Sequence, residues 1–253
     1  MPSAKSSVAV RISCPFGKWV IAKTGNRAVM LASLLVGFPL RAIGRCMKTR
    51  NAIDSFTEIA TLRIELDGSD PLIWRVVEVP TSMTLKVLHD IVQVTMGWCD
   101  YHLWEMAIDG NTYGLPMDED FGAAPPKAAA RVRLRDVLGS GTTRIDYTYD
   151  FGDSWEHSLT VSDVRAGAPG TAYPRFVAGE RGCPPEDCGG IPGFYEMLEA
   201  RIDPLHPDHA EMAEWLDGYD PEDLDIFPIE VALGRIAARR NAAAKRIVKP
   251  AND

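Results

Sequence analysis

Residues 59–80 read IATLRIELDGSDPLIWRVVEVP, and this stretch decides the fold. Every second residue from Ala60 to Leu66 is apolar and the residues between them are polar, which is the period-two pattern of a strand with one buried face. The Asp, Gly, Ser and Pro residues at 67–71 favour a turn, and a second apolar run at 72–79 ends at Pro80. The stretch therefore predicts a β-hairpin.

The next segment carries a helix signal followed by a strand signal. Thr84 is suited to cap a helix over residues 85–96, whose apolar residues fall on one stripe, and Gly97 is suited to end it. Residues 102–108 alternate again and predict a third strand.

The second half of the chain contains another predicted hairpin and then helices. Residues 144–149 and 155–161 have strand patterns on either side of a turn at 150–154. A Gly- and Pro-rich loop follows at 167–193. Three helices are predicted after this loop, over residues 194–201, 207–216 and 229–240.

Strands dominate the first half of this pattern and helices dominate the last third, which indicates an α+β fold. We expect a single domain with a mostly antiparallel sheet, packed helices and C-terminal helices. Its bounds are predicted at 47–233, and a basic tail, helical or disordered, follows at 234–253.

Residues 1–46 form a basic head with a different composition. The first 50 positions hold nine of the 27 Lys and Arg residues and none of the 35 Asp and Glu residues. We expect that translation starts at Met47 and that the head lies outside the domain. There are two alternatives. The head is a secretory signal with the apolar run 28–40 as its core, or it is a genuine basic arm. That run is too short to cross a bilayer, which takes about 20 residues, so no membrane span is expected.

The rest of the chain is strongly acidic. Beyond residue 50 the net charge is −17, which repels phosphate backbones, so we expect no non-specific nucleic-acid binding by the domain. The five Cys residues are odd in number and irregularly spaced, which does not indicate a disulfide framework. A reducing cytoplasm is the expected location.

The second hairpin holds the first candidate site. Period two places Trp155 and His157 on one face of its second strand, beside Asp150 and Asp153 in the turn. Both aspartates could simply accept hydrogen bonds from turn amides. Alternatively, a His beside carboxylates can act as a general base or metal ligand. With His102, the candidate catalytic residues are therefore His102, Asp150, Asp153 and His157.

A second candidate site is the string CPPEDCGG at 183–190. Cys183 and Cys188 are separated by four residues, at the upper edge of the spacing in zinc hairpins, and His157 is an available further ligand. A zinc site is thus one interpretation. A reversible disulfide is a second, and two small buried thiols in a tight Pro/Gly loop are a third.

Several strings together resemble the plasmid-Ri ORF-three-like family, also labelled insertion-element passenger TnpR proteins. They are PLIWR at 71–75, MGW at 96–98, HL at 102–103, YTYDFGDSWEH at 147–157, YPR at 173–175, and CPPEDCGG at 183–190. The resemblance covers residues 57–233 and implies a compact α+β domain of no established activity, found on plasmids and beside transposition genes. The TnpR label suggests a resolvase, but the sequence shows no serine-recombinase nucleophile motif and no helix-turn-helix pattern.

The resemblance extends the candidate residues to Glu186 and Asp187. We expect a binding or accessory module of a mobile element, which recognises a protein or small ligand through Trp155, His157, Glu186 and Asp187. The alternative is a metal-dependent hydrolase that uses the Asp and His residues near the second hairpin. No cofactor is expected in the first case, and zinc is the candidate in the second.

Overall fold

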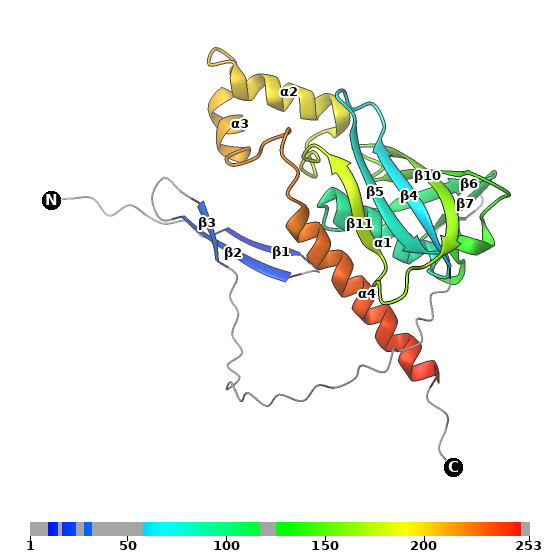
Figure 1. Ribbon diagram of the computed structural model, residues 1–253. Helices are drawn as coiled ribbons and strands as arrows, with labels where there is room; N and C mark the ends of the chain where they lie inside the picture. Colours follow the sequence, from blue (N-terminus) through cyan, green and yellow to red (C-terminus); the bar gives the residue numbers. More distant parts are fainter. Residues whose placement is uncertain (1–9, 15–16, 24–27, 32–57, 117–124, 249–253) are drawn as a thin grey trace, which may run out of the picture. The chain divides into compact units, whose positions relative to one another are not determined.

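A computed structural model describes residues 10–14, 17–23, 28–31, 58–116 and 125–248 (Figure 1). The chain divides into two compact units, residues 1–50 and 51–253. Met47, the expected start, and most of the apolar run at 28–40 lie outside the described residues. No helix in the described ranges is long and apolar enough to cross a membrane.

The described part of the first unit is a small antiparallel sheet, to which the sequence analysis assigned no structure. Its strands follow chain order and are joined as β1-β2-β3. Their bounds are Val10–Cys14, Gly17–Lys23 and Ala28–Leu31.

The second unit is built on an eight-stranded sheet with the order β11-β5-β4-β10-β9-β6-β7-β8. All pairs are antiparallel except β7 and β8, which confirms the predicted α+β fold with a mostly antiparallel sheet. The strands are β4 (Glu58–Leu66), β5 (Ile73–Pro80), β6 (Trp104–Ile108), β7 (Asn111–Gly114), β8 (Lys127–Ala128), β9 (Thr143–Tyr149), β10 (Trp155–Ala166) and β11 (Arg175–Glu180).

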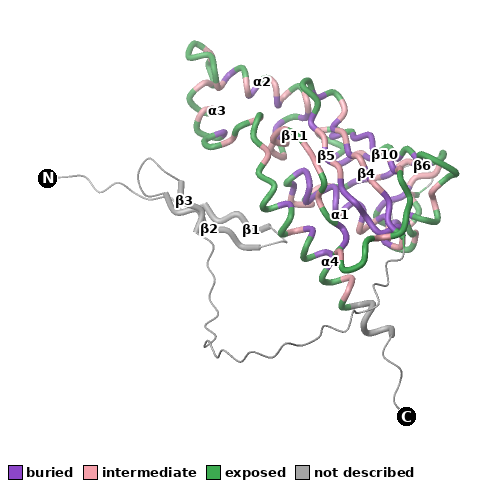
Figure 2. Tube along the Cα trace, in the orientation of Figure 1, coloured by how far each residue is buried: buried purple, intermediate pink, exposed green. Residues whose placement is uncertain are grey.

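The two predicted hairpins meet at the centre of this sheet, because β10 pairs with β4 on one side and with β9 on the other. Alternate residues of both strands are fully buried, including Leu62 and Ile64 of β4 and Leu159 of β10. Figure 2 shows the buried residues concentrated in these strands and in α1. The period-two pattern of the sequence therefore identifies the core face.

Helix α1 spans Leu85–Met96, the predicted bounds. The Thr84 hydroxyl accepts a hydrogen bond from the amide of Val87, and Gly97 has a left-handed conformation, with its amide bonded to Gln93. Both ends of the helix thus use the capping chemistry that the sequence predicts.

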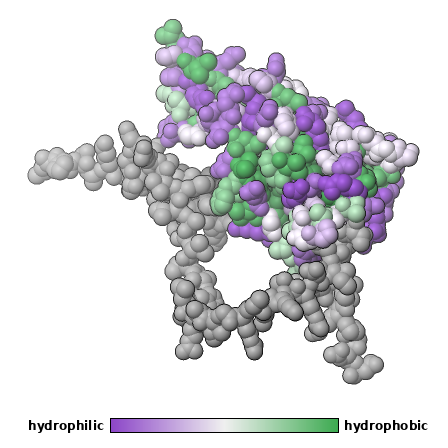
Figure 3. Space-filling model, viewed as in Figure 1, coloured by the Kyte–Doolittle hydropathy of each residue, from purple (hydrophilic) through white to green (hydrophobic). Residues whose placement is uncertain are grey.

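Three further helices follow in the described part of the unit. They are α2 (Gly190–Ile202), α3 (His209–Trp215) and α4 (Ile226–Val248). Helix α4 buries Ile229 and Leu233, and it contacts both α1 and β11. On the face shown in Figure 3, apolar side chains gather over β11 and α4, to which the exposed Val177 and Val231 belong.

The stretch 167–193, which the sequence predicts to be rich in loops, also contains a strand that was not predicted. Residues 175–180 form the edge strand β11, which pairs with β5 through a register that shifts between Phe176 and Ala178. The segment has no period-two pattern, and its pairing with β5 fixes its conformation instead.

Candidate functional site

Among the described residues there are two groups in which a His and two Asp side chains lie close together. One is His89 with Asp90 and Asp100, and the other is His102 with Asp150 and Asp187. In each group, ligand-type atoms of all three residues lie within 4.8 Å of one another. The first group was not predicted, whereas the second unites three of the predicted residues. We call them the His89 cluster and the His102 cluster.

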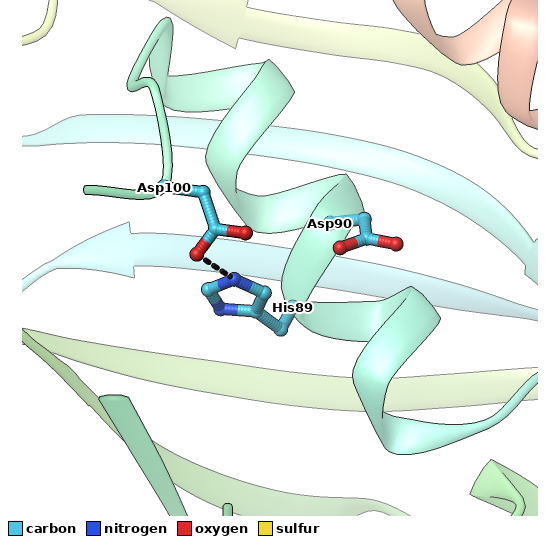
Figure 4. A group of neighbouring side chains, drawn as sticks. All are labelled: His89, Asp90 and Asp100. Carbon is cyan, nitrogen blue, oxygen red and sulfur yellow. Dashed lines mark hydrogen bonds and ion pairs between the residues drawn. The ribbon is translucent and has the colours of Figure 1, made fainter. Parts of the chain in front are cut away.

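In the His89 cluster, the imidazole comes from α1 and is completely buried (Figure 4). Its Nε2 lies 2.8 Å from Asp100 Oδ1, and its Nδ1 lies 2.9 Å from the hydroxyl of Tyr147. Gln93 donates a hydrogen bond to the same hydroxyl, and the imidazole stacks on Trp104 with ring centroids 4.1 Å apart. Both ring nitrogens therefore have partners inside the protein.

A lysine forms ion pairs with both carboxylates of this cluster. Lys86 Nζ lies 2.8 Å from Asp90 Oδ1 and 3.2 Å from Asp100 Oδ2. Burial lowers the pKa of His89, although the hydrogen bond to Asp100 acts in the opposite direction. Burial also acts to raise the pKa of Asp100, but the contacts with His89 and Lys86 outweigh it and lower the pKa. The cluster is thus an imidazole, two carboxylates and an ammonium, in which each group has a partner from the same cluster or from Tyr147.

The His102 cluster is built from three segments far apart in the sequence. His102 Nδ1 lies 3.6 Å from Asp150 Oδ2, and its Nε2 lies 3.0 Å from Asp187 Oδ1. The side chain of Asp150 is 12% exposed, that of His102 28% and that of Asp187 66%. The cluster therefore runs from a nearly buried carboxylate to solvent.

These segments form what we call the rim: residues 97–103 after α1, the β9–β10 turn at 150–154, and the loop at 183–190. Glu186 joins the loop to the other parts. It accepts a hydrogen bond from the Tyr149 hydroxyl at 2.5 Å and another from the Cys99 amide at 2.9 Å. Both carboxylate oxygens of Glu186 therefore hold the loop against the other two segments, and its contact with a ligand stays a prediction.

Further contacts in the rim hold Pro184, Gly189 and Gly190 of the CPPEDCGG string in place. Trp98 Nε1 donates to the carbonyl of Pro184, and the Gly189 amide donates to Asp153 Oδ2. A Cβ at Gly190 would collide with the carbonyl oxygen of Asp153. The loop and the hairpin turn thus pack side by side, as expected, and Asp153 serves this packing.

The rim also carries strained backbone and exposed apolar side chains. Asp150 and Asp187 both have the left-handed conformation, with φ of 55° and 59°, which is rare for residues other than glycine and concentrates at functional sites. Tyr101, Leu103 and Phe151 are each about half exposed. Large apolar groups at the surface are a feature of recognition surfaces.

Trp155 and His157 lie in the core, whereas the ligand hypothesis requires them at the surface. They share one face of β10, as predicted, but that face is the core: their exposures are 0% and 1%. The His157 ring donates from Nδ1 to the Trp155 carbonyl and packs edge-on against Trp98. Burial lowers the pKa of His157 to about 4. A ligand on the surface therefore reaches neither ring.

The cysteines do not form a metal site with His157 in this arrangement. Cys183, Cys188 and His157 are not among the groups of neighbouring metal-ligand residues found in the described ranges. Burial raises the pKa of both thiols to about 12, so that they stay protonated at neutral pH. The geometry favours the packing interpretation of the two thiols.

The start of the loop is held by a residue that the sequence analysis did not single out. Arg75 is 1% exposed, and its guanidinium donates to four backbone carbonyls, those of Trp74, Thr95, Glu180 and Arg181. An isolated Arg on a strand with alternating burial gives no sequence signal for such a role.

A hollow of about 500 Å³ lies away from the rim. It is formed near the start of β4 and the bulge of β10, with Glu58, Arg135 and Asp163 among its lining residues. None of the residues that line this hollow belongs to the rim.

The protein is thus an α+β protein in which a loop rich in Cys and Pro packs against the turn of a central hairpin. The chain belongs to the plasmid pRiA4b ORF-3-like protein family, whose model matches residues 58–227, and this confirms the resemblance seen in the sequence. It is 36% identical to the uncharacterized protein y4hQ of Sinorhizobium fredii, over 74% of this chain and 97% of that protein. It is also similar to the crystal structure of a protein of unknown function, MM3350, from Methanosarcina mazei Go1. The TM-score is 0.61 and the identity 33%, over 68% of this chain and 97% of that one.

Proposed function

We propose that the protein is a binding module and that the rim is its recognition surface. The observation that carries the proposal is the convergence of three distant segments, which places the half-exposed Tyr101, Leu103 and Phe151 in the same segments as the His102 cluster. Buried polar contacts hold these segments in place before any ligand binds. Aromatic groups beside a few oriented polar groups are typical of recognition sites.

The geometry favours this function over the hydrolase alternative. A hydrolase site would need His102, Asp150, Asp153 and His157 in one open cleft. His157 is buried in the core, and Asp153 accepts a hydrogen bond from the loop. Only two of the four groups are therefore placed to meet a substrate.

The plasmid origin of the family's name supports a further part of the proposal, that the module serves a mobile element in the cytoplasm. Its partner would then be a protein or small molecule that presents an apolar group to the rim.

The test is affinity capture from host lysate with the full chain as bait, quantified by mass spectrometry. Replacing Tyr101 and Phe151 by Ser removes exposed rings and leaves the Tyr101 amide bond to Tyr149 in place. We expect this double variant to lose the partners that the wild type enriches. The matched control replaces Ile202 and Leu205, which are more exposed and lie outside the rim, by Ser. Equal loss in both variants, or in neither, would reject the rim as the recognition surface.

A further inference from the structure

The charge balance of the His102 cluster differs from that of its neighbour. Asp150 and Asp187 face one imidazole, and no Lys or Arg of the described ranges pairs with either of them. In the His89 cluster, by contrast, Lys86 lies between the two carboxylates. With a neutral His102, two negative charges therefore lie close together without a counterion, which favours the binding of a cation.

Asp150 provides a second, independent observation. The residue is 9% exposed, and its Oδ1 accepts a hydrogen bond from the Gly152 amide. Its Oδ2 points toward His102 but receives no hydrogen bond from any described residue, since the distance to Nδ1 is 3.6 Å. The Nε2 atom of His102 is buried and has no partner in hydrogen-bond geometry, although Asp187 Oδ1 lies 3.0 Å away, and such an atom costs free energy unless a cation or another group compensates it.

We propose that His102, Asp150 and Asp187 bind one divalent transition-metal ion. The inference rests on the proposed function, because the ion would be part of the rim that recognises the ligand. Metal–ligand bonds are about 2.1 Å long, so donor atoms on one ion lie up to about 4 Å apart. The donors of the cluster lie within 4.8 Å of one another, and the exposed Asp187 side chain would have to rotate for all three to meet on one ion, because the two aspartates now lie at different ring nitrogens of His102.

The donor set selects the class of ion. One imidazole nitrogen and two carboxylate oxygens suit Zn²⁺, Mn²⁺ or Fe²⁺ better than Ca²⁺ or Mg²⁺, which prefer oxygen ligands alone. Three protein ligands leave at least one coordination position open. Because the Asp187 side chain is 66% exposed, a carboxylate or other anionic group of the rim's ligand could reach an ion held there.

The competing account is that a protonated His102 alone bridges the two aspartates. The full chain, stripped with EDTA, is titrated with Mn²⁺ and free Mn²⁺ is followed by electron paramagnetic resonance, with Zn²⁺ measured by calorimetry. We expect one ion per chain, and affinity at least about tenfold lower in His102→Ala and Asp150→Asn. The Asn variant keeps an oxygen that can accept from the Gly152 amide. Circular dichroism checks the fold, and Asp187→Asn serves where another variant does not fold.

His206→Ala is the matched control, because its side chain is also 28% exposed and lies 4.0 Å from a carboxylate, that of Asp208. A Cys183→Ser, Cys188→Ser double variant separates this site from a thiolate site, and we expect it to retain binding. No binding to the wild type at millimolar Mn²⁺ or Zn²⁺ overturns the inference, as does equal binding by His102→Ala. The two proposals fail separately: unchanged partner capture by the Tyr101/Phe151 variant rejects the rim as the recognition surface, whereas a wild type that captures partners but binds no ion rejects the metal site alone.

Discussion

His89 and His102 lie on either side of Gly97, and each faces two aspartates, yet their surroundings differ in almost every physical respect. His89 is buried, both of its ring nitrogens have partners, and Lys86 supplies the positive charge. His102 is partly exposed and its aspartates lack any such cation among the described residues. The same residue types therefore form a closed structural network in one place and an open candidate site in the other. The two clusters have similar distances between their side chains. They differ in whether each hydrogen-bond donor and acceptor has a partner within the protein.

The largest difference between the clusters should appear in stability. His89→Ala leaves the Tyr147 hydroxyl and Asp100 without a partner and opens a cavity beside Trp104. We expect the free energy of unfolding to fall by about 3–4 kcal/mol, while His102→Ala changes it by less than about 0.5 kcal/mol. Urea denaturation of both variants is the measurement. Equal losses would mean that the two clusters are not closed and open as described.

A second test uses acid to reach the buried histidines. Burial lowers the pKa of His89, and lowers that of His157 from 6.5 to about 4. The unfolded chain therefore binds more protons than the folded one below about pH 6.5, and stability must fall as the pH drops from there toward 4. His157 alone should contribute on the order of 3 kcal/mol to this loss. His157→Gln should flatten the dependence of unfolding free energy on pH, and a wild type equally stable at pH 6.5 and pH 4.5 would contradict the assignment.

A third test asks whether the open cluster depends on the docked loop while the closed cluster does not. Gly190→Ala places a Cβ against the Asp153 carbonyl, whereas Gly110→Ala meets no atom within 4 Å. Both glycines have nearly the same φ, +69° and +72°, so the cost of the left-handed conformation, about 1 kcal/mol, is shared. We expect Gly190→Ala to be less stable than Gly110→Ala by about a further 2 kcal/mol. Nuclear magnetic resonance should show displaced signals at His102 and unchanged ones at His89; displaced signals at both would remove the distinction.

The smallest expected effect concerns nucleic acid. An open acidic cluster that attracts cations should repel phosphate, and the chain beyond residue 50 has a net charge of −17. We expect residues 47–233 to give no gel shift with duplex DNA at about 100 mM salt. Binding that tightens steeply as salt is lowered would show that phosphate contacts exist and that the charge argument is wrong.

The sequence predicts those parts of the protein that local chemistry determines. Helix α1 has the predicted bounds because Thr84 and Gly97 cap it, and the central strands follow period two because one face is buried. Strand β11 escaped prediction because its pairing with β5 depends on residues distant in the chain.

The site was predictable in part for the same reason. The turn and the loop carry unusual strings, so Asp150 and Asp187 were among the candidates and His102 does meet both. The pattern also put Trp155 and His157 on one face, and the apolar Leu159 on the same face was a signal that this face is the core. For the His89 cluster a signal was present: His89 and Gln93 are four residues apart beside the apolar stripe of α1, and both are fully buried. Two polar residues in such positions indicate an internal network.

The hydroxyl of Tyr149 receives hydrogen bonds from the amides of Tyr101 and His102 and donates one to Glu186. One oxygen atom thus connects all three segments of the rim. Ordering flexible loops on binding costs conformational entropy, typically several tenths to more than 1 kcal/mol for each immobilised side chain. In this protein the fold already orders these segments, so a ligand of the proposed recognition surface would not have to supply that free energy.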